Sequence, residues 1–286
     1  MRRALSLLTL VAFLGGCKAS PTPGDQLTID EEEFILAVND DLVAYEKARK
    51  AGLIEDQRTH QHRLTRTADE RRETLVKAVK CNDYKGRMVA AATLGFSAND
   101  DVLGILIDAL SDSDTTVRHH ALWGLAVHGS DQTPVNPIIA QLNDPDAEIR
   151  VNALGALSKV LRRGNDKGAM SAILERLGDA DWRVRGQAVL AIAAVGRKDS
   201  IPILVEKPLK DDAAEVRLDA VGALFVIADP KSIDPLIGAL VDADQRVADT
   251  AERALEQLTG QKFGKEPAKW QTWWTNRQAL GMGLDH

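Results

Sequence analysis

The stretch DSDTTVR at residues 112–118 opens a segment that returns four more times along the chain. The later copies are DPDAEIR at 144–150, DADWRVR at 179–185, DDAAEVR at 211–217 and DADQRVA at 242–248. The sixth residue of every copy is apolar, and these anchors are 32, 35, 32 and 31 residues apart: Val117, Ile149, Val184, Val216 and Val247. A regular period of this length is typical of a repeat protein in which each copy is one structural unit.

The residues after each anchor predict an amphipathic helix. Four residues on, the chain always has Ala; seven on, it has Gly or Ala; eight on, it has Leu or Ile. Positions i, i+4, i+7 and i+8 share one helical face, so each copy begins a helix that buries a narrow stripe. Another amphipathic helix is expected before each copy, at 102–110, 137–142, 169–177, 201–209 and 233–241. One such hairpin cannot bury both stripes alone, so the hairpins are expected to stack into a solenoid.

This order of helix, Asp-rich turn and helix resembles HEAT repeats, in the short form also found in phycobilisome-lyase-type proteins. The resemblance covers residues 82–259 and implies an all-α, right-handed α-solenoid of HEAT-like helical hairpins. It also implies a structural ladder between arginines and turn aspartates of neighbouring repeats, formed by Arg118, Arg150, Arg185 and Arg217. The last copy has Ala248 in place of the Arg, as expected where no further repeat stacks. The turn aspartates are also expected to cap the second helix of each repeat.

The N-terminus carries an export signal rather than a membrane span. Two arginines precede a run of about 13 apolar residues, which is shorter than the ~20 that a span needs. The sequence Leu14-Gly15-Gly16-Cys17 resembles a bacterial lipobox, which implies cleavage after residues 1–16 and a diacylglyceryl group on Cys17. The alternative is an ordinary signal peptide with an incidental Cys. Residues 17–27 are then expected to be a flexible tether.

The lipobox resemblance also implies a location in the cell. Lys18 follows the Cys where inner-membrane lipoproteins have Asp, which indicates the bacterial outer membrane, facing the periplasm, with surface exposure as an alternative. Removing Arg2 and Arg3 leaves 34 Lys and Arg against 42 Asp and Glu, a formal charge of −8. An acidic protein of this kind argues against nucleic acid as a partner. Cys81 is left without an intramolecular partner and is either a small buried hydrophobe or a reactive thiol.

The two ends lack the repeat signature. Residues 28–81 are expected to form a helical hairpin that caps the first repeat, because an acidic helix that starts at Asp30 precedes a basic helix at about 55–80. Alternatively, the basic helix lies on anionic lipid headgroups. Residues 260–286 place Trp270, Trp273 and Trp274 on one helical face. They are interpreted as an end cap, with an aromatic platform for a partner or glycan as the alternative.

No catalytic motif is found. There is no zinc-type Cys spacing, phosphate-binding loop or nucleophile elbow. The neighbouring histidines His119 and His120 diverge on a helix, as do His60 and His62. The His-Glu pairs that mark the di-iron HEAT-type deoxyhypusine hydroxylases are also missing. No catalytic residue, metal or cofactor is therefore predicted.

The predicted binding surface is the concave face of the solenoid. Positions two, three and six after an anchor point away from the buried stripe, and in the first strong repeat they are His119, His120 and Trp123. The third repeat adds Gln187 and, in its turn, Trp182. The sequence thus favours a lipid-anchored, non-catalytic scaffold that binds a protein partner in the cell envelope. The alternative is an enzyme or enzyme subunit, lyase-like or ligand-binding, that uses the same face.

Overall fold

The structure, a computed structural model, describes residues 26–161, 168–196 and 198–284. Every regular element in these ranges is a helix and none is a strand, so the prediction of an all-α solenoid of helical hairpins is confirmed. The chain divides into two compact units, one ending at Val160 and the other beginning at Leu161. The predicted signal peptide, Cys17 and the tether up to residue 25 lie outside the described residues. No described helix is both long and apolar enough to cross a membrane.

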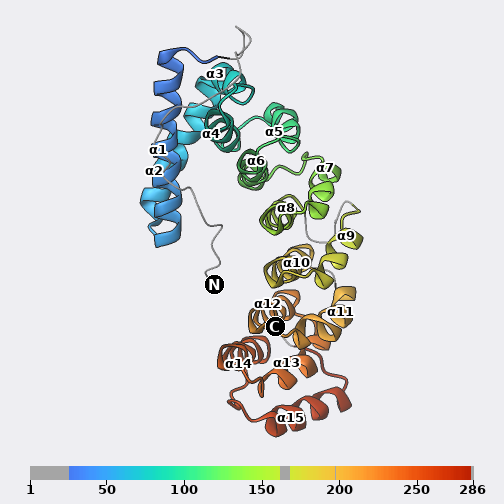
Figure 1. The fold of residues 1–286 in the computed structure, drawn as a ribbon. Helices are drawn as coiled ribbons and strands as arrows, with labels where there is room; N and C mark the ends of the chain where they lie inside the picture. The colour runs from blue at the N-terminus through green and yellow to red at the C-terminus, as the bar shows by residue number, and fades with distance from the viewer. Residues whose placement is uncertain (1–25, 162–167, 197, 285–286) are drawn as a thin grey trace. The chain divides into compact units, whose positions relative to one another are not determined.

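The first unit begins with a helical pair and continues as repeats. Its helices are α1 (Ile29–Ala51), α2 (Ile54–Glu70), α3 (Arg72–Ala78), α4 (Tyr84–Leu94), α5 (Leu103–Ala109), α6 (Thr115–His128), α7 (Val135–Ala140) and α8 (Ala147–Val160). Within this unit the second helices of the repeats, α4, α6 and α8, stack in one layer, and α5 and α7 form the other (Figure 1). The pair α1 and α2 packs against α4 on the side away from α5.

The second unit repeats the two-layer arrangement. Its helices are α9 (Met170–Glu175), α10 (Trp182–Val195), α11 (Ile201–Glu206), α12 (Ala214–Ile227), α13 (Ile233–Ala239), α14 (Gln245–Thr259) and α15 (Pro267–Ala279). The second helices α10, α12 and α14 contact one another in order, and α15 closes the unit by packing against α13.

Small residues bring the second helices close together. The Ala four residues after each anchor is fully buried, at Ala121, Ala153, Ala188, Ala220 and Ala251. At Gly95, the C-cap of α4, the approach to α6 is tight: an added Cβ would lie 2.4 Å from the Cα of Gly124. No side chain larger than hydrogen fits between these backbones.

The α-helical part of each first helix ends earlier than predicted. Three of them end as α-helix after only six residues, at Ala140, Glu175 and Glu206, and continue as 3-10 turns at Gln141–Asn143, Arg176–Gly178 and Pro208–Lys210. A 3-10 turn tightens a helix end and satisfies carbonyl groups that have no α-helical partner. In the third case Pro208 also removes the N–H that a continuing α-helix requires.

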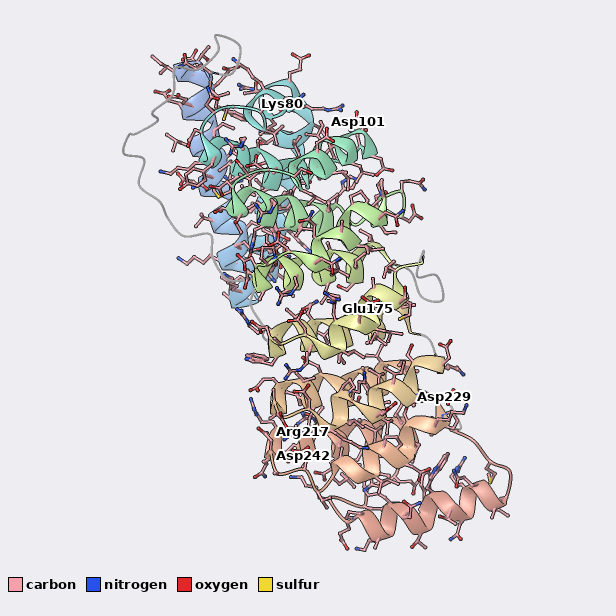
Figure 2. All side chains as sticks on the ribbon, turned by 45° about the vertical axis from the view of Figure 1, so that its right-hand side comes forward. Lys80, Asp101, Glu175, Arg217, Asp229 and Asp242 are labelled. Atoms are coloured by element: carbon pink, nitrogen blue, oxygen red, sulfur yellow. The ribbon has the colours of Figure 1, made fainter. Side chains whose placement is uncertain are left out.

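The aspartates of the turns have two structural roles: one pairs with an arginine of the preceding repeat, and the other caps the following helix. The first Asp of a turn accepts from an arginine of the preceding repeat, with Nε–Oδ2 distances of 2.6 Å for Arg185–Asp211 and 2.8 Å for Arg217–Asp242 (Figure 2). Arg118 makes a single bond of 3.2 Å to Asp144. Arg150 donates to the carbonyl groups of its own turn, at 2.9 Å and 3.2 Å. The second Asp caps the following helix, at Asp114, Asp146, Asp181 and Asp244. Ala213 breaks this rule, so α12 has no side-chain cap.

The predicted basic helix at 55–80 is two helices, broken at Arg71 between α2 and α3. Its basic side chains pair inside the protein: Lys77 lies 2.6 Å from Glu31, and Arg63 lies 3.2 Å from Asp41. Helix α1 supplies most of the apolar contact through Ile35, Val38, Leu42 and Tyr45, whereas α2 buries only Leu64 and Ala68. Internal ion pairing of this kind favours a cap over a helix that lies on lipid headgroups.

The tryptophans of α15 are mostly buried. Trp270 and Trp274 are 0% and 1% exposed, and the Trp270 Nε1 donates to the Gly264 carbonyl at 2.7 Å. Trp273 is half-buried and lies beside Phe263, with the Arg277 guanidinium 5.4 Å from its ring centre. Two of the three rings therefore face the protein, as an end cap requires.

Candidate functional site

The predicted histidine and tryptophan cluster in α6 lies under α1. His120 and Trp123 are 5% and 9% exposed, so the expectation that they face solvent is wrong. Tyr45 of α1 packs edge-on against Phe96 and Trp123, with ring centres 5.0 Å and 6.3 Å away. The position on the helix was read correctly, but a helix from outside the repeats covers it.

The two histidines are held neutral. Burial lowers the pKa of His119 to about 3, and the neighbouring His120 adds to this effect. Burial also lowers the pKa of His120, whose Nδ1 donates to the Thr116 carbonyl at 2.7 Å. The Nδ1 of His119 accepts from the Asn152 amide at 2.8 Å. These contacts fix the rings in place, and at neutral pH neither carries a charge.

In the second unit, none of the described elements packs on the corresponding surface as α1 packs on α4. The Arg ladder sets the register between repeats, so residues at the same distance from each ladder position lie on neighbouring helices. We define the second-helix face by two positions in each of α10, α12 and α14. These lie five and nine residues after the ladder position, which is Arg185, Arg217 and Ala248 respectively. They are Leu190, Gly222 and Arg253, followed by Ala194, Val226 and Gln257.

This second-helix face is partly apolar and open. Leu190 and Val226 are 38% and 53% exposed. A Cβ added to Gly222 would meet nothing within 4 Å. Exposed aliphatic side chains on one face favour protein association, because a partner that packs on them removes them from water.

One cation on this face lacks a carboxylate partner within the described part of the chain. Arg253 is exposed and donates only to the Thr250 hydroxyl, at 2.9 Å. The other arginines nearby are paired: Arg183 lies 2.7 Å from Asp181, and Arg246 lies 3.1 Å from Glu215. Arg253 is therefore the residue on this face that is best placed to meet an anionic group.

The remaining predicted residues, Trp182 and Gln187, belong to α10 in the second unit. Trp182 is 38% exposed and Gln187 is half-buried. Leu190 and Arg253 were not among the predicted residues. Their spacing points to the same face, because both lie six positions after an anchor, as Trp123 does.

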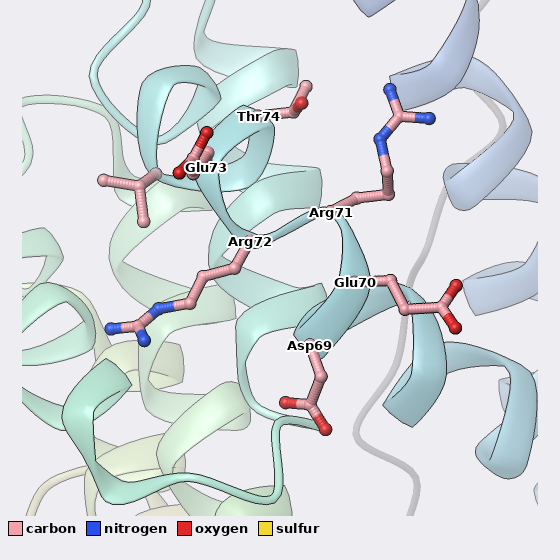
Figure 3. A pocket seen from close by; sticks show the side chains of 7 residues that line it. Asp69, Glu70, Arg71, Arg72, Glu73 and Thr74 are labelled. Carbon is pink, nitrogen blue, oxygen red and sulfur yellow. The ribbon is translucent and has the colours of Figure 1, made fainter.

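A separate open cavity of about 660 Å³ lies at the break between α2 and α3. Figure 3 shows that Arg71 and Arg72 point to opposite sides of it. Arg72 pairs with Asp101, Arg71 lies 4.3 Å from the Phe34 ring centre, and Asp69 accepts from Ser97. Its charged groups thus serve internal contacts and do not converge on a ligand. Within the described ranges no group of three potential metal ligands is found.

The repeat type agrees with a known family. Residues 135–224 match the family model of HEAT repeats. With the two-layer fold, this match defines the class of the protein: an α-solenoid built from HEAT-like repeats. A search of curated proteins by sequence gives no match.

Solved structures share the fold at low sequence identity. The chain is similar to the YibA protein of Escherichia coli, with 18% identity, a TM-score of 0.55 and coverage of 88% of this chain and 98% of YibA. It is also similar to a designed armadillo repeat protein in complex with the peptide (KR)4, with 22% identity, a TM-score of 0.50 and coverage of 64% and 97%. The CpcE–CpcF complex of phycocyanin lyase from a Nostoc species has 18% identity, a TM-score of 0.46 and coverage of 92% and 99%.

Proposed function

We propose that this protein is a scaffold that binds a partner protein through the second-helix face of its second unit. The observation that carries the proposal is the exposure of Leu190 and Val226 on that face. In the first unit α1 packs on α4, and its Tyr45 contacts the ring of Trp123, which has the same repeat position as Leu190 and is buried. Burying exposed aliphatic area is the main favourable contribution to protein association.

The solenoid fold supports the same function. Stacked repeats present an extended surface instead of a compact pocket, which suits the recognition of protein segments. A designed armadillo repeat protein of similar fold has been solved with a peptide bound.

The scaffold is anchored in the cell envelope through a lipid on Cys17. The lipobox-like sequence Leu14-Gly15-Gly16-Cys17 and the following Lys18 support an outer-membrane address that faces the periplasm. Acyl chains on the first residue after cleavage would hold the solenoid close to the membrane, because more than one chain gives stable anchoring.

The test is cross-linking in living cells that produce the protein with its native signal, followed by affinity capture and mass spectrometry. We expect one dominant envelope protein with the wild type and none with the double variant Leu190→Lys and Val226→Lys. The matched control is Val241→Lys, which places the same charge on an exposed apolar residue of a turn in the same unit. Equal capture by all three proteins would contradict the proposed surface.

The anchor has its own test. Metabolic labelling with a palmitate analogue is expected to mark the wild type and to leave Cys17→Ser unlabelled. Labelled Cys17→Ser, or an unlabelled wild type, would refute the anchor and leave the binding surface untouched.

A further inference from the structure

The first unit shows what this kind of surface binds. There a long amphipathic helix, α1, packs on α4 of the second-helix layer, and its buried residues Ile35, Val38, Leu42 and Tyr45 follow a helical stripe. Figure 1 shows α1 beside α4, on the side away from α5. Tyr45 packs against Phe96, in the turn after α4, and against Trp123 of α6.

We call the site on which the Tyr45 ring packs its seat. The two repeat positions that form this seat can be located in the second unit. Arg87 of α4 pairs with Asp112 at 2.7 Å, as the ladder arginines pair with the first Asp of the next turn. Phe96 lies nine residues after Arg87, in the turn after α4, and Trp123 lies five residues after Arg118. Counted from the ladder residues Arg185 and Arg217, the same two sequence positions are Ala194 of α10 and Gly222 of α12.

The second seat is larger than the first. Where the first unit has two aromatic rings, the second has a methyl group and a hydrogen atom, and the space above Gly222 is open. Exposed Leu190 and Val226 occupy positions of the same second-helix face as Gly222. A bulky apolar side chain of a partner would therefore find both room and aliphatic contacts there.

Charge adds a second requirement on the partner. Arg253 occupies the position equivalent to Trp123 on the next helix, α14, and has no carboxylate partner in the described residues. An acidic residue at the edge of the partner's apolar stripe would supply that partner. A desolvated Arg–carboxylate pair gives orientation as well as affinity.

We propose that the second-helix face of the second unit binds an amphipathic helix of the partner, with a large apolar residue seated over Gly222 and a carboxylate paired with Arg253. This inference rests on the proposed function and specifies the partner's chemistry. It predicts a helix-in-groove mode, in which apolar residues recur every three or four positions.

The experiment places a diazirine amino acid of the size of leucine at position 190 of the full chain, where it leaves the space over Gly222 open, and maps the cross-linked partner segment by mass spectrometry. Position 241 is the matched control, because Val241 is an exposed aliphatic residue in a turn of the same unit. We expect cross-links from 190, absent from 241, to a segment with a helical apolar period and flanking acids. For the binding measurements Gly238 is the match for Gly222, because it lies on α13 in the other layer and is equally open. A synthetic peptide of that segment is then titrated against wild type, Gly222→Leu, Gly238→Leu and Arg253→Gln.

The outcomes separate the two proposals. Filling the seat in Gly222→Leu should weaken peptide binding by at least about tenfold, and Gly238→Leu should bind like the wild type. Arg253→Gln should weaken binding and reduce its dependence on salt. A cross-linked segment without a helical period, or full binding by Gly222→Leu, would overturn the helix proposal while the scaffold function stands. No cross-link from 190 would overturn both.

Discussion

At the residue scale, Trp123 is a core residue of the first unit. Its ring contacts Phe96 and Tyr45, with centres 5.6 Å and 6.3 Å away. Trp123→Ala is therefore expected to lower the free energy of unfolding by about 3–5 kcal/mol, as for other buried aromatic residues. Urea unfolding measures this loss. Trp182→Ala, which truncates a partly exposed ring, should cost far less; equal losses would contradict the assignment.

The buried histidines predict that acid destabilises the protein well above the range in which its carboxylates titrate. The pKa of His119 is about 3 in the folded chain and near 6.5 when it is unfolded, so the unfolded state binds more protons between these values. Stability is then complete above pH 6.5 and falls as the pH drops below it. The slope reaches at most about 1.4 kcal/mol per pH unit for each histidine.

This dependence is measured by urea unfolding at pH 7.5, 6.5 and 5.5. The double variant His119→Gln and His120→Gln serves as the control, because it removes the titrating groups. The wild type should lose stability between pH 6.5 and 5.5, and the variant should change much less. A wild type that gains stability on acidification in this interval would contradict the burial of both rings.

Single residues also show where sequence reasoning ends. The small residues of the helical stripe were predicted, because their spacing is local and repeats five times. The burial of Trp123 was not predictable, because it depends on Tyr45, which lies outside the repeats and far away in the chain. Leu190 could have been predicted to lie on the candidate face, since it occupies the same repeat position as Trp123. In the second unit no described helix like α1 covers that position.

At the element scale, the close approach of α4 and α6 depends on glycine. Gly95→Ala would push a methyl group into the backbone of Gly124, so we expect a loss of about 1–3 kcal/mol. Gly104→Ala on α5 is the matched control, because its added Cβ meets nothing. Helix propensity should make that variant neutral or slightly more stable than the wild type. Thermal unfolding that ranks the two variants in the opposite order would be inconsistent with this packing.

The ladder between repeats is expected to be a measurable source of stability. Arg217 makes two bonds of 2.8 Å to Asp242, and the guanidinium group lowers the pKa of that carboxyl below its ordinary value. Arg217→Gln leaves a half-buried carboxylate without its cation and should cost about 1–3 kcal/mol. Arg253→Gln, which breaks no ion pair, should leave the unfolding midpoint nearly unchanged. An equal effect of both substitutions would show that the ladder adds nothing specific.

Elements were predicted well where the sequence repeats and less well elsewhere. The second helices follow the anchors, because their stripe has a clear period. The break at Arg71 was missed, since α2 buries only Leu64 and Ala68 and its polar sequence gives little sign of where one helix ends and the next begins.

At the scale of the whole molecule, the two units have the same type of repeat but differ in the exposure of their second-helix layer. In the first unit α1 packs on α4 and its Tyr45 contacts Trp123 of α6, whereas in the second unit Leu190 and Val226 are exposed. The fold class could be predicted from the repeat alone. Which of the two units keeps its second-helix layer exposed could not be predicted, because this depends on where the non-repeating helix α1 packs. The predicted anchor at Cys17 rests on sequence alone.

Covalent footprinting of the full chain by mass spectrometry, with and without the captured partner, tests this account most directly. Without the partner, Leu190 and Val226 should be modified readily while Tyr45 and Trp123 stay protected. With the partner, modification of Leu190 and Val226 should fall and that of Val241 should not change. Rapid modification of Trp123, or protection of Val241 in place of Leu190, would contradict the claim that the second unit carries the binding surface.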